Sequence, residues 1–291
     1  MTSDPIFTIA DLRAAVAARR ASGLVGLVPT MGALHAGHAS LIKHARHADA
    51  TVAVSIFVNP LQFDRPDDLQ RYPRSLDADV ALCRSLGVDL VFAPTVEEMY
   101  PKPPECSVSV GRLADHLCGR FRPGHFAGVA TVVLKLFEIV QADRAYFGEK
   151  DAQQLAIIRR LVSDFNLPVR IIGVPTVRES DGLALSSRNQ RLDPAERALA
   201  PSLYRALHRM RGDIASGVAD VDELKRAGAA EIPADHRLKL EYLDIVEPDD
   251  FQPVQQVRGT VVAAGALWVG ATRLIDNVTC TPGSAMTSAD A

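Results

Sequence analysis

Short apolar runs alternate with segments of helical periodicity from residue 9 to residue 174. In the helical segments apolar residues recur every three or four positions, as a single buried face requires. The apolar runs have the length of strands that are buried on both faces of a sheet. The expected strands are residues 24–29, 51–58, 88–93, 145–147 and 169–174, and the expected helices are residues 9–21, 39–48, 76–86, 129–140 and 152–165. This alternation predicts an α/β fold with a parallel sheet of the Rossmann type. Loops are expected at 95–104 and 121–128, and a short strand or edge turn at 108–113.

The pattern changes after residue 176. A polar loop at 179–189 leads into a long helix at 194–216 and a shorter one at 221–230, and strands follow at 238–246 and 260–269. Two helices followed by strands predict a smaller α+β domain. We therefore expect a Rossmann-type domain over residues 1–176 and a smaller C-terminal domain over residues 177–291, with a disordered tail after Cys280.

Composition changes the fold prediction little, but it limits the classes of molecule that we expect the protein to bind. The 291 residues carry a net charge of -3, with 47% hydrophobic and 23% charged side chains, as in ordinary globular proteins. This charge argues against nucleic acid or a membrane as a partner. The N-terminus lacks the pattern of a secretory signal, and no apolar run approaches the ~20 residues of a membrane helix. Cys83, Cys106, Cys118 and Cys280 form no Cys-x-x-Cys pair, so we expect free thiols in a cytoplasmic protein.

The stretch between the first strand and the following helix contains the first candidate site. It holds two histidines and two glycines: His35, His38, Gly32 and Gly37. Ligands bind at this carboxyl edge of a doubly wound sheet, and a helix N-terminus there offers N–H groups and partial positive charge to phosphate. Two imidazoles can also donate hydrogen bonds to phosphate oxygens and stabilise charge that develops on phosphorus.

Two simpler interpretations of the histidine pair remain open. An arbitrary His-x-x-His is most often a pair of surface histidines. The other interpretation is zinc chelation, since His44 and His47 repeat the spacing, but no Cys or Glu stands nearby at ligand spacing. The strand–loop–helix context favours phosphate over both.

Two further motifs carry groups suited to phosphate. Gly148-Glu149-Lys150-Asp151 follows another expected strand, and Lys150 is a cation suited to a triphosphate. Ser186-Ser187-Arg188-Asn189 lies in the polar loop, where two hydroxyls and a guanidinium can close over phosphates. Taken alone, the first motif is better explained as a capped helix start and the second as an ordinary domain linker.

Amide and charged side chains add weaker candidates. These are the amides Gln62, Gln153 and Gln154, the cationic cluster Arg120, Arg122 and His125, and the acids Asp77 and Asp79. The amides can bind hydroxyl and carboxylate groups, although exposed helix polarity explains them as well. The cationic cluster either neutralises an anion or only lies on a loop. The acids can help to hold magnesium, but solvation on a helix surface is the simpler role.

Motifs of other enzyme classes are absent from the sequence. No Gly-x-Gly-x-x-Gly follows the first strand and no Gly-x-x-x-x-Gly-Lys-Ser/Thr occurs, which argues against a dinucleotide dehydrogenase and a P-loop enzyme. A Gly-x-Ser-x-Gly elbow is also missing, and Asp115 and His116 make no hydrolase set with the serines. The anion-suited groups at strand ends, helix starts and the polar loop together predict a nucleoside triphosphate held for attack at its α-phosphate.

The motifs resemble those of the pantothenate synthetase (pantoate–β-alanine ligase) family. Pro-Thr-Met-Gly-Ala-Leu-His-Ala-Gly-His (29–38) is similar to that family's form of the His-x-Gly-His signature of class I adenylating enzymes and nucleotidyltransferases. The other similar segments are Phe-Val-Asn-Pro-Leu-Gln-Phe (57–63), Arg-Pro-Gly-His-Phe (122–126), Tyr-Phe-Gly-Glu-Lys-Asp-Ala-Gln-Gln-Leu (146–155) and Asp-Gly-Leu-Ala-Leu-Ser-Ser-Arg-Asn (181–189). The C-terminal domain matches the family only by position and size.

The resemblance implies a two-step reaction. Pantoate attacks the α-phosphate of ATP with Mg²⁺ to give pantoyl adenylate and pyrophosphate, and β-alanine then forms pantothenate and AMP, a step toward coenzyme A. It implies a cytoplasmic homodimer with no tight metal site of its own, in which the first domain binds nucleotide and pantoate and the second acts as a lid that excludes water.

The resemblance also assigns site residues. The implied catalytic residues are His35, His38, Lys150, Ser186, Ser187 and Arg188. The implied ATP-binding residues are Met31, Gly32, Ala33, Leu34, His35, Ala36, Gly37, His38, Gly148, Glu149, Lys150, Asp151, Val177 (through its backbone), Leu185, Ser186, Ser187 and Arg188. Gln62 and Gln154 would bind pantoate, and Gln62 would also contact β-alanine.

Two positions depart from the family pattern. Leu185 stands where some members have Met, and the similar volume predicts little effect. Cys118 stands where many have Glu, which puts a carboxylate contact there in doubt. Three other functions stay open: another His-x-Gly-His nucleotidyltransferase, a regulatory nucleotide-binding module without turnover, and a nucleic-acid binder of related fold, against which the negative charge counts.

Overall fold

A parallel sheet of five strands forms the centre of one part of the molecule, in a computed structural model that describes residues 4–283. The strands are β1 (Val25–Thr30), β2 (Thr51–Ile56), β3 (Leu90–Phe92), β4 (Arg144–Gly148) and β5 (Arg170–Val174). Their order is β3-β2-β1-β4-β5, and Leu27 of β1 lies opposite Ala53 on one side and Ala145 on the other. The chain order reverses between β1 and β4, so the carboxyl ends of these two strands mark the expected ligand edge. The predicted α/β fold is confirmed.

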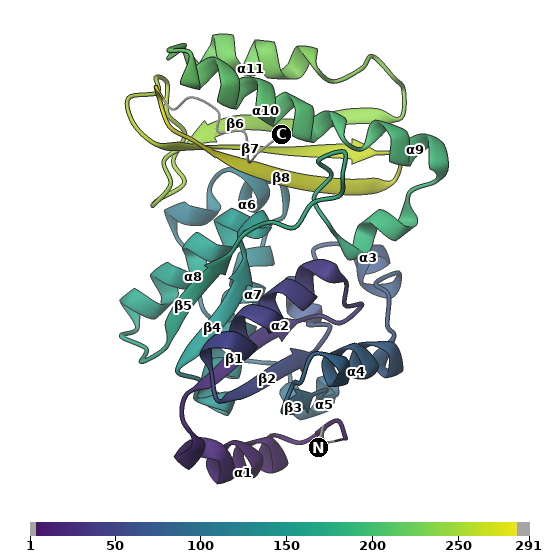
Figure 1. Ribbon diagram of the computed structural model, residues 1–291, viewed down its shortest axis with the longest axis vertical. Coiled ribbons are helices and arrows are strands. Elements are labelled where there is room, and N and C mark those ends of the chain that lie inside the picture. The colour runs from purple at the N-terminus through teal and green to yellow at the C-terminus, as the bar shows by residue number, and fades with distance from the viewer. Residues whose placement is uncertain (1–3, 284–291) are drawn as a thin grey trace. The chain divides into compact units, whose positions relative to one another are not determined.

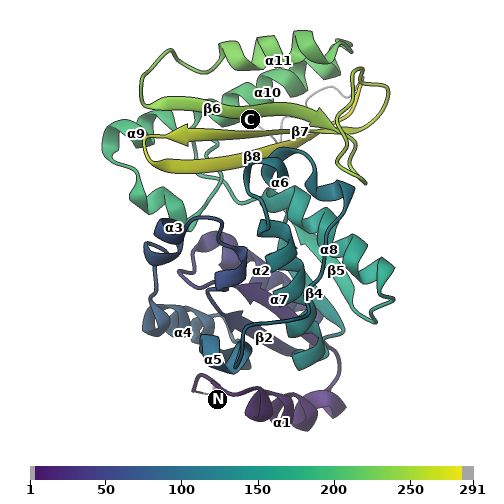
Figure 2. The same ribbon diagram turned by 180° about the vertical axis from the view of Figure 1, so that it is seen from behind.

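Helices cover both faces of this sheet (Figures 1 and 2). Helices α2 (Ala36–Ala48) and α4 (Leu76–Ser85) pack on one face, where Leu41, Ile42 and Cys83 join the core. Helix α7 (His125–Val140) packs against β1, and α1 (Ile9–Arg19) packs against α7. Burial of the strands between these layers explains why they are continuous apolar runs in the sequence.

Several predicted boundaries in this region were wrong. Helix α2 begins three residues before the expected start because His35 caps it, and α7 begins at His125 inside the predicted loop. The proline-rich loop at 95–104 contains α5 (Val96–Met99), which Thr95 caps. No strand or bridge occurs at 108–113. Further short helices that the sequence did not predict are η1 (Arg20–Ser22), η2 (Pro60–Gln62), α3 (Pro66–Gln70), η3 (Arg112–Ala114) and α6 (Leu117–Phe121).

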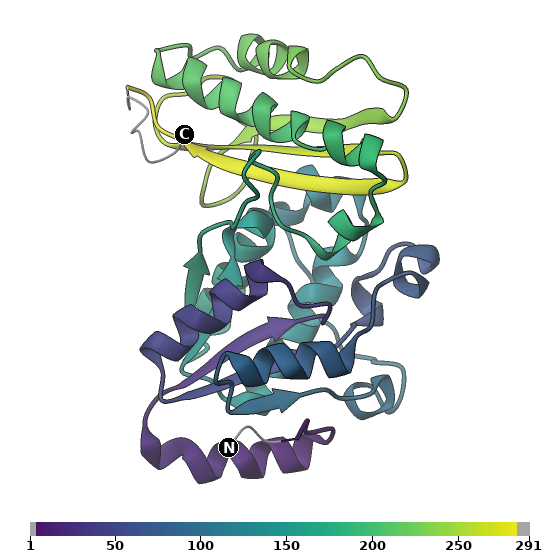
Figure 3. The ribbon, with the colours of Figure 1, turned by 45° about the vertical axis from the view of Figure 1, so that its right-hand side comes forward.

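A second sheet is antiparallel, with the order β6-β7-β8. Its strands are β6 (Leu238–Val246), β7 (Val261–Val269) and β8 (Thr272–Cys280), and its helices are α9 (Pro194–Leu199), α10 (Ser202–Ala215) and α11 (Val221–Ala230). Helices α10 and α11 pack on one face around Leu207, Met210 and Leu224, as Figure 3 shows for α10. Helix α6 packs on the opposite face through Leu117.

Two predictions for this second sheet were wrong. The long helix at 194–216 is two helices, because Pro201 has no N–H to donate and stands at the N-cap of α10. Strand β8 was missed, because its buried face includes Thr272 and Asp276 and so lacks an apolar alternation.

The chain forms two compact units. The first comprises the described residues up to Val110, then Arg122–Glu149 and Ile157–Val177; the second comprises Gly111–Phe121, Lys150–Ala156 and the described residues from Arg178 onward. Both η4 (Glu149–Asp151) and α8 (Ala152–Asp164) contribute residues to each unit. The domain boundary at 176/177 stays a prediction from the sequence. Residues 284–291 of the predicted disordered tail lie outside the described residues. No helix within 4–283 combines the length and apolar character needed to cross a membrane.

Candidate active site

The turn between β1 and α2 is held by one buried carboxylate. Gly32 has φ +80° and Ala33 has φ +50°, so two successive residues adopt the left-handed conformation. Both carboxylate oxygens of Asp79 accept backbone hydrogen bonds, from the N–H of Ala33 at 2.9 Å and from that of Leu34 at 2.7 Å. Asp79 is 3% exposed, whereas Asp77 on the same helix is exposed. The expected solvated role is therefore wrong for Asp79, which fixes the turn.

The two histidines cap helix α2 with their own side chains. His35 is the N-cap, and its Nδ1 accepts a hydrogen bond from the N–H of Gly37 at 3.1 Å. The Nδ1 of His38 accepts one from the N–H of His35 at 3.3 Å, and the ring centroids lie 4.1 Å apart. A ring nitrogen that accepts a hydrogen bond carries no proton, so each neutral ring holds its proton on Nε2. The sequence motif thus gives two Nε2–H donors at one helix N-terminus, and these suit phosphate oxygens.

The described residues provide no set of ligands that would support the zinc interpretation of the histidine pair. His44 and His47 are exposed further along α2, and Nδ1 of His44 lies 2.8 Å from the carbonyl of Ser40. In the part of the chain that the structure describes, no three His, Cys, Asp or Glu side chains are grouped as metal ligands.

The Gln62 side chain is oriented by Asn59, which sequence reasoning did not select. Oε1 of Gln62 accepts a hydrogen bond from Nδ2 of Asn59 at 3.2 Å, and its Nε2 donates to Sδ of Met31 at 2.9 Å. Asn59 is 1% exposed and also donates to the carbonyl of Gly128 and accepts from the hydroxyl of Tyr100. Burial raises the pKa of Tyr100 to about 12, so this hydroxyl stays a donor at neutral pH. The only signal in the sequence was an Asn at the end of an apolar strand.

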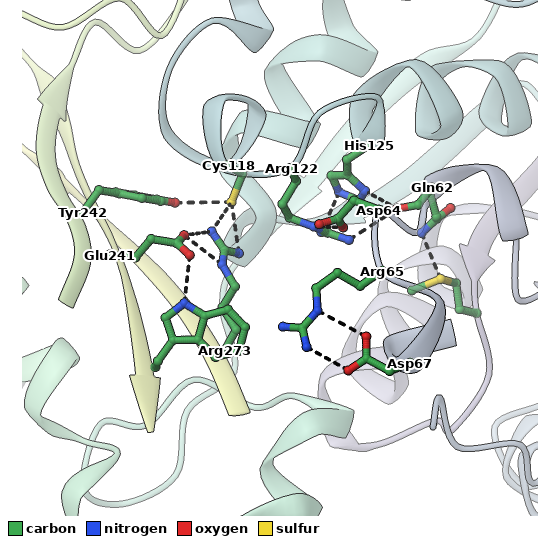
Figure 4. Close-up of polar contacts among 12 residues, drawn as sticks. Gln62, Asp64, Arg65, Asp67, Cys118, Arg122, His125, Glu241, Tyr242 and Arg273 are labelled. Atoms are coloured by element: carbon green, nitrogen blue, oxygen red, sulfur yellow. Dashed lines mark hydrogen bonds and ion pairs between the residues drawn. The ribbon is translucent and has the colours of Figure 1, made fainter. Parts of the chain in front are cut away.

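The Gln62 backbone is held by two residues of the predicted cationic cluster (Figure 4). Nδ1 of His125 donates to the Gln62 carbonyl at 2.7 Å, and Nη2 of Arg122 donates to it at 3.3 Å. Arg122 also donates to Nε2 of His125 at 2.9 Å and to Asp64 at 3.0 Å. These contacts give Arg122 and His125 a role that neither sequence interpretation named. The guanidinium of Arg120 lies 6.0 Å from the Phe121 ring centre.

Lys150 belongs to the second unit, in the short helix η4 that follows β4. Its carbonyl accepts a hydrogen bond from Nδ2 of Asn277 on β8 at 2.8 Å. Among the neighbouring amides, Gln153 is buried and donates to the carbonyls of Leu113 and His116 at 2.8 Å, so it has a structural role. Gln154 is half-buried.

The Ser-Ser-Arg segment is part of a helical turn, η5 (Ser187–Arg191). Oγ of Ser186 caps this turn by accepting from the N–H of Arg188 at 3.3 Å, and Ser187 is 7% exposed. The loop just before it is anchored by two arginines. Arg178 pairs with Asp276 at 2.6 Å, and Arg197 pairs with Glu179 and with Asp181, each at 2.6 Å. The predicted polar loop is thus an ordered segment.

Cys118 lies beside an arginine that already has a carboxylate partner (Figure 4). Sγ of Cys118 lies 3.3 Å from the hydroxyl of Tyr242 and 3.6 Å from both terminal nitrogens of Arg273. Arg273 forms an ion pair with Glu241 at 2.5 Å, and Trp268 donates to the same carboxylate at 2.8 Å. Burial and the neighbouring Cys118 raise the pKa of Tyr242 well above its usual value. A Glu at 118 is therefore not needed to pair Arg273.

The predicted site residues are divided between the two units. The first unit holds Met31, Gly32, Ala33, Leu34, His35, Ala36, Gly37, His38, Gln62, Gly148, Glu149 and Val177, and the second holds Lys150, Asp151, Gln154, Leu185, Ser186, Ser187 and Arg188. Within the first unit, β1 and β4 are neighbours, so the turn of residues 31–34, which follows β1, and Gly148, the last residue of β4, lie at adjacent strand ends.

The family model and the related proteins that match this chain indicate the same family. The family model described as pantoate-beta-alanine ligase matches residues 5–279. A bifunctional pantoate ligase/cytidylate kinase from Synechococcus elongatus is 56% identical over 260 residues, which cover 88% of this chain and 49% of that protein. The chain therefore spans about half the length of this relative.

Two solved structures resemble this chain over almost their whole length. The crystal structure of pantothenate synthetase from Thermus thermophilus has a TM-score of 0.90 and 49% identity, covering 95% of this chain and 99% of that one. The pantoate-beta-alanine ligase from Francisella tularensis, complexed with beta-gamma ATP and beta-alanine, has a TM-score of 0.78 and 37% identity, covering 94% and 96%.

Proposed function

The chain belongs to the pantoate-beta-alanine ligase family, and from this premise we propose that it condenses pantoate with β-alanine to pantothenate at the expense of ATP. In the first step a pantoate carboxylate oxygen bonds to the α-phosphorus of ATP, and the bond from that phosphorus to pyrophosphate breaks. In the second step the amine of β-alanine attacks the acyl carbon of the adenylate. The bond to AMP breaks, and the amine proton is released.

The observation that carries this proposal is the paired imidazole arrangement at the start of α2. Nε2–H groups on His35 and His38 donate to phosphate oxygens, and His38 stabilises the negative charge that grows as the α-phosphorus is attacked. The helix N-terminus adds partial positive charge at the same place. Because backbone N–H groups fix both rings, the donors need little reorganisation when the charge develops.

The remaining groups are assigned to ATP and pantoate by the family resemblance. Lys150 neutralises phosphate charge and Ser186, Ser187 and Arg188 bind the phosphates, with Gly148, Glu149, Asp151, Leu185 and the backbone of Val177 completing the nucleotide contacts. Gln62 and Gln154 bind pantoate, and Gln62 also meets β-alanine. The orientation of Gln62 supports its part, because Asn59 occupies its Oε1 and Met31 accepts from its Nε2, so the second hydrogen of Nε2 is the donor toward a carboxylate or hydroxyl.

Mg²⁺ enters this proposal with ATP, as part of the substrate. Asp79 uses both oxygens on backbone N–H groups, so it is not a spare ligand for the ion. Magnesium bound to nucleotide keeps most of its ligands as phosphate oxygens and water. The homodimer and the cytoplasmic location stay predictions from the resemblance and from the thiol pattern.

The test is isotope exchange between pyrophosphate and ATP, followed by AMP release. We expect exchange to require pantoate but not β-alanine, and AMP to accumulate only when ATP, pantoate and β-alanine are all present. Exchange that ran equally without pantoate would rule out this order. Pyrophosphate release with a nucleotide-linked product and no use of β-alanine would indicate another nucleotidyltransferase. ATP binding without pyrophosphate from any acid would indicate a regulatory module.

A further inference from the structure

Lys150 has a tertiary restraint on its backbone that its own short helix does not provide. It lies in η4, a turn of three residues between β4 and α8. Its carbonyl accepts a 2.8 Å hydrogen bond from the side-chain amide of Asn277, which is 127 residues away in sequence. Because this bond comes from the paired strand β8, it fixes the Lys150 carbonyl relative to that strand and restricts the positions that the Lys150 ammonium can reach.

Asn277 is itself held from both sides. Its N–H donates to Oδ1 of Asp276 at 2.8 Å, and its carbonyl accepts from Nη2 of Arg178 at 3.3 Å. In the sheet it lies opposite Ala264 of the central strand β7. The amide that holds Lys150 therefore projects from a fixed backbone.

The neighbouring Arg178–Asp276 pair is a bidentate ion pair with a buried carboxylate. Nη1 and Nη2 of Arg178 reach the two oxygens of Asp276 at 2.6 and 3.0 Å, and the Asp276 side chain is 4% exposed. Burial raises the pKa of Asp276, and the positive charges of Arg178 and Lys150 oppose that rise. Arg178 also donates to the carbonyl of Gly182, in the loop that precedes Ser186. Two adjacent residues of β8 thus make both contacts. Asn277 bonds directly to Lys150, and Asp276 pairs with Arg178, which in turn bonds to the loop before Ser186.

We propose that Asn277 is a positioning residue for Lys150, holding the lysine backbone so that its ammonium meets the phosphates of ATP in the geometry the first half-reaction needs. This inference rests on the proposed function, because it takes Lys150 to act on ATP. Asn277 contacts the backbone of Lys150, so its effect on turnover passes through that residue. A misplacement of about 1 Å in such a group can cost up to about 100-fold in rate.

The test compares Asn277→Ala and the near-isosteric Asn277→Asp with Thr279→Ala, which changes an exposed residue two positions along the same strand. Pantoate-dependent pyrophosphate exchange is measured for each, with KM values for ATP and pantoate and the melting temperature. Both Asn277 variants should lose about 10- to 100-fold in exchange kcat, with KM for pantoate within about twofold of wild type. Thr279→Ala should match wild type.

A double-variant cycle separates positioning from general stability. In a Lys150→Ala background, Asn277→Ala should cost less than about twofold further, because the group that it positions is already absent. The same 10-fold or greater loss in both backgrounds, or an Asn277→Ala enzyme within about twofold of wild type, would overturn the inference. Failure of the proposed function has a different signature: wild-type protein itself would show no pantoate-dependent exchange.

Discussion

The β1–α2 turn and strand β8 hold proposed ATP-binding groups in opposite ways. In the turn, His35 and His38 accept hydrogen bonds from backbone N–H groups two and three residues away, and the rings cap their own helix. On β8, Asn277 reaches Lys150 across 127 residues of sequence, and Asp276 pairs with Arg178 across 98. The first arrangement is local and uses neutral donors, whereas the second is long-range and depends on a buried ion pair. A local site can be recognised from a contiguous motif, but a long-range one becomes visible only when the chain is folded.

The largest effect that tests the local site is the loss of His38. His38→Ala should lower turnover by about 100- to 1,000-fold, because it removes a donor aimed at developing phosphate charge. It also removes the acceptor for the N–H of His35, which should cost about 1 kcal/mol of folding stability. Exchange kinetics and urea unfolding measure the two effects.

His47→Ala is the matched control for this variant, since His47 is exposed on the same helix. It should leave both turnover and stability near wild type. Unchanged turnover in His38→Ala together with a large loss of stability would make the pair a structural cap only, and the contrast with β8 would lose its functional meaning.

The next effect concerns the long-range arrangement. Arg178→Met leaves the buried Asp276 carboxylate without its guanidinium partner, which should cost about 3 kcal/mol in the free energy of unfolding. Arg178→Met combined with Asp276→Leu should recover much of that loss, because no unpaired charge then remains. Urea unfolding gives the free energies of both variants.

Arg209→Met serves as the control in the same unit. Arg209 pairs with Asp213 one helical turn away, at the surface, and such pairs contribute about 0.5 kcal/mol or less. If Arg178→Met were as mild as Arg209→Met, the buried pair would not be what anchors β8, and the long-range half of the comparison would be wrong.

The same contrast explains how far the sequence could predict this molecule. The parallel sheet was predictable because its inner strands β1 and β2 are buried along almost their whole length and are mostly apolar. The histidine turn was predictable because its residues are contiguous. Strand β8 was missed because Asp276 is buried among apolar positions, where its pairing with Arg178 satisfies it. The break at Pro201 was missed because the apolar periodicity continues across it.

The supporting residues of the site were harder to predict than its donors. Asn277 supports Lys150 across 127 residues of sequence. Asn59 is only three residues from Gln62, but it is itself held by Gly128 and Tyr100, which lie 69 and 41 residues away, so the sequence around it does not reveal its role. Asp79 was identified as an acid on a helix, but its partners lie 45 and 46 residues earlier in the chain. Donors for phosphate can be predicted from residue type in the sequence. The contacts that position those donors form only through tertiary packing.

Asp79 offers a sharper test, because it is the long-range element inside the local site. Asp79→Asn keeps the shape but places an N–H₂ group where an acceptor is needed, leaving a backbone N–H of Ala33 or Leu34 unpaired. This should cost about 2 kcal/mol in the free energy of unfolding. Asp77→Asn, two residues away on the exposed face, should cost only a few tenths of a kcal/mol.

Magnesium distinguishes the two roles that Asp79 could have. As a clamp on the turn, Asp79→Asn should lose the same stability with and without Mg²⁺ in urea unfolding without nucleotide. A loss that appeared only when Mg²⁺ was added would make Asp79 a metal ligand and would remove the long-range clamp from the local site.

The smallest effect compares the two units through their buried thiols at alkaline pH. Burial, and then the charge of Asp79, raises the pKa of Cys83 from 9.0 to about 12, and burial raises that of Cys280 on β8 to about 11. An acid whose pKa is higher in the folded state keeps its proton longer there than in the unfolded chain. The contribution of each thiol to folding stability is therefore fully present below pH 9 and falls as the pH rises above it, by about 1.4 kcal/mol per thiol at pH 10.

Cys83→Ser and Cys280→Ser should each remove the pH dependence that is due to the replaced thiol, as measured by urea unfolding between pH 8 and 10, whereas the exposed Cys106→Ser should not change the pH dependence. Asp79→Asn should weaken the share due to Cys83 and leave that of Cys280 intact, since the Asp79 charge acts on Cys83; an equal change in both would contradict the independence of the two thiols.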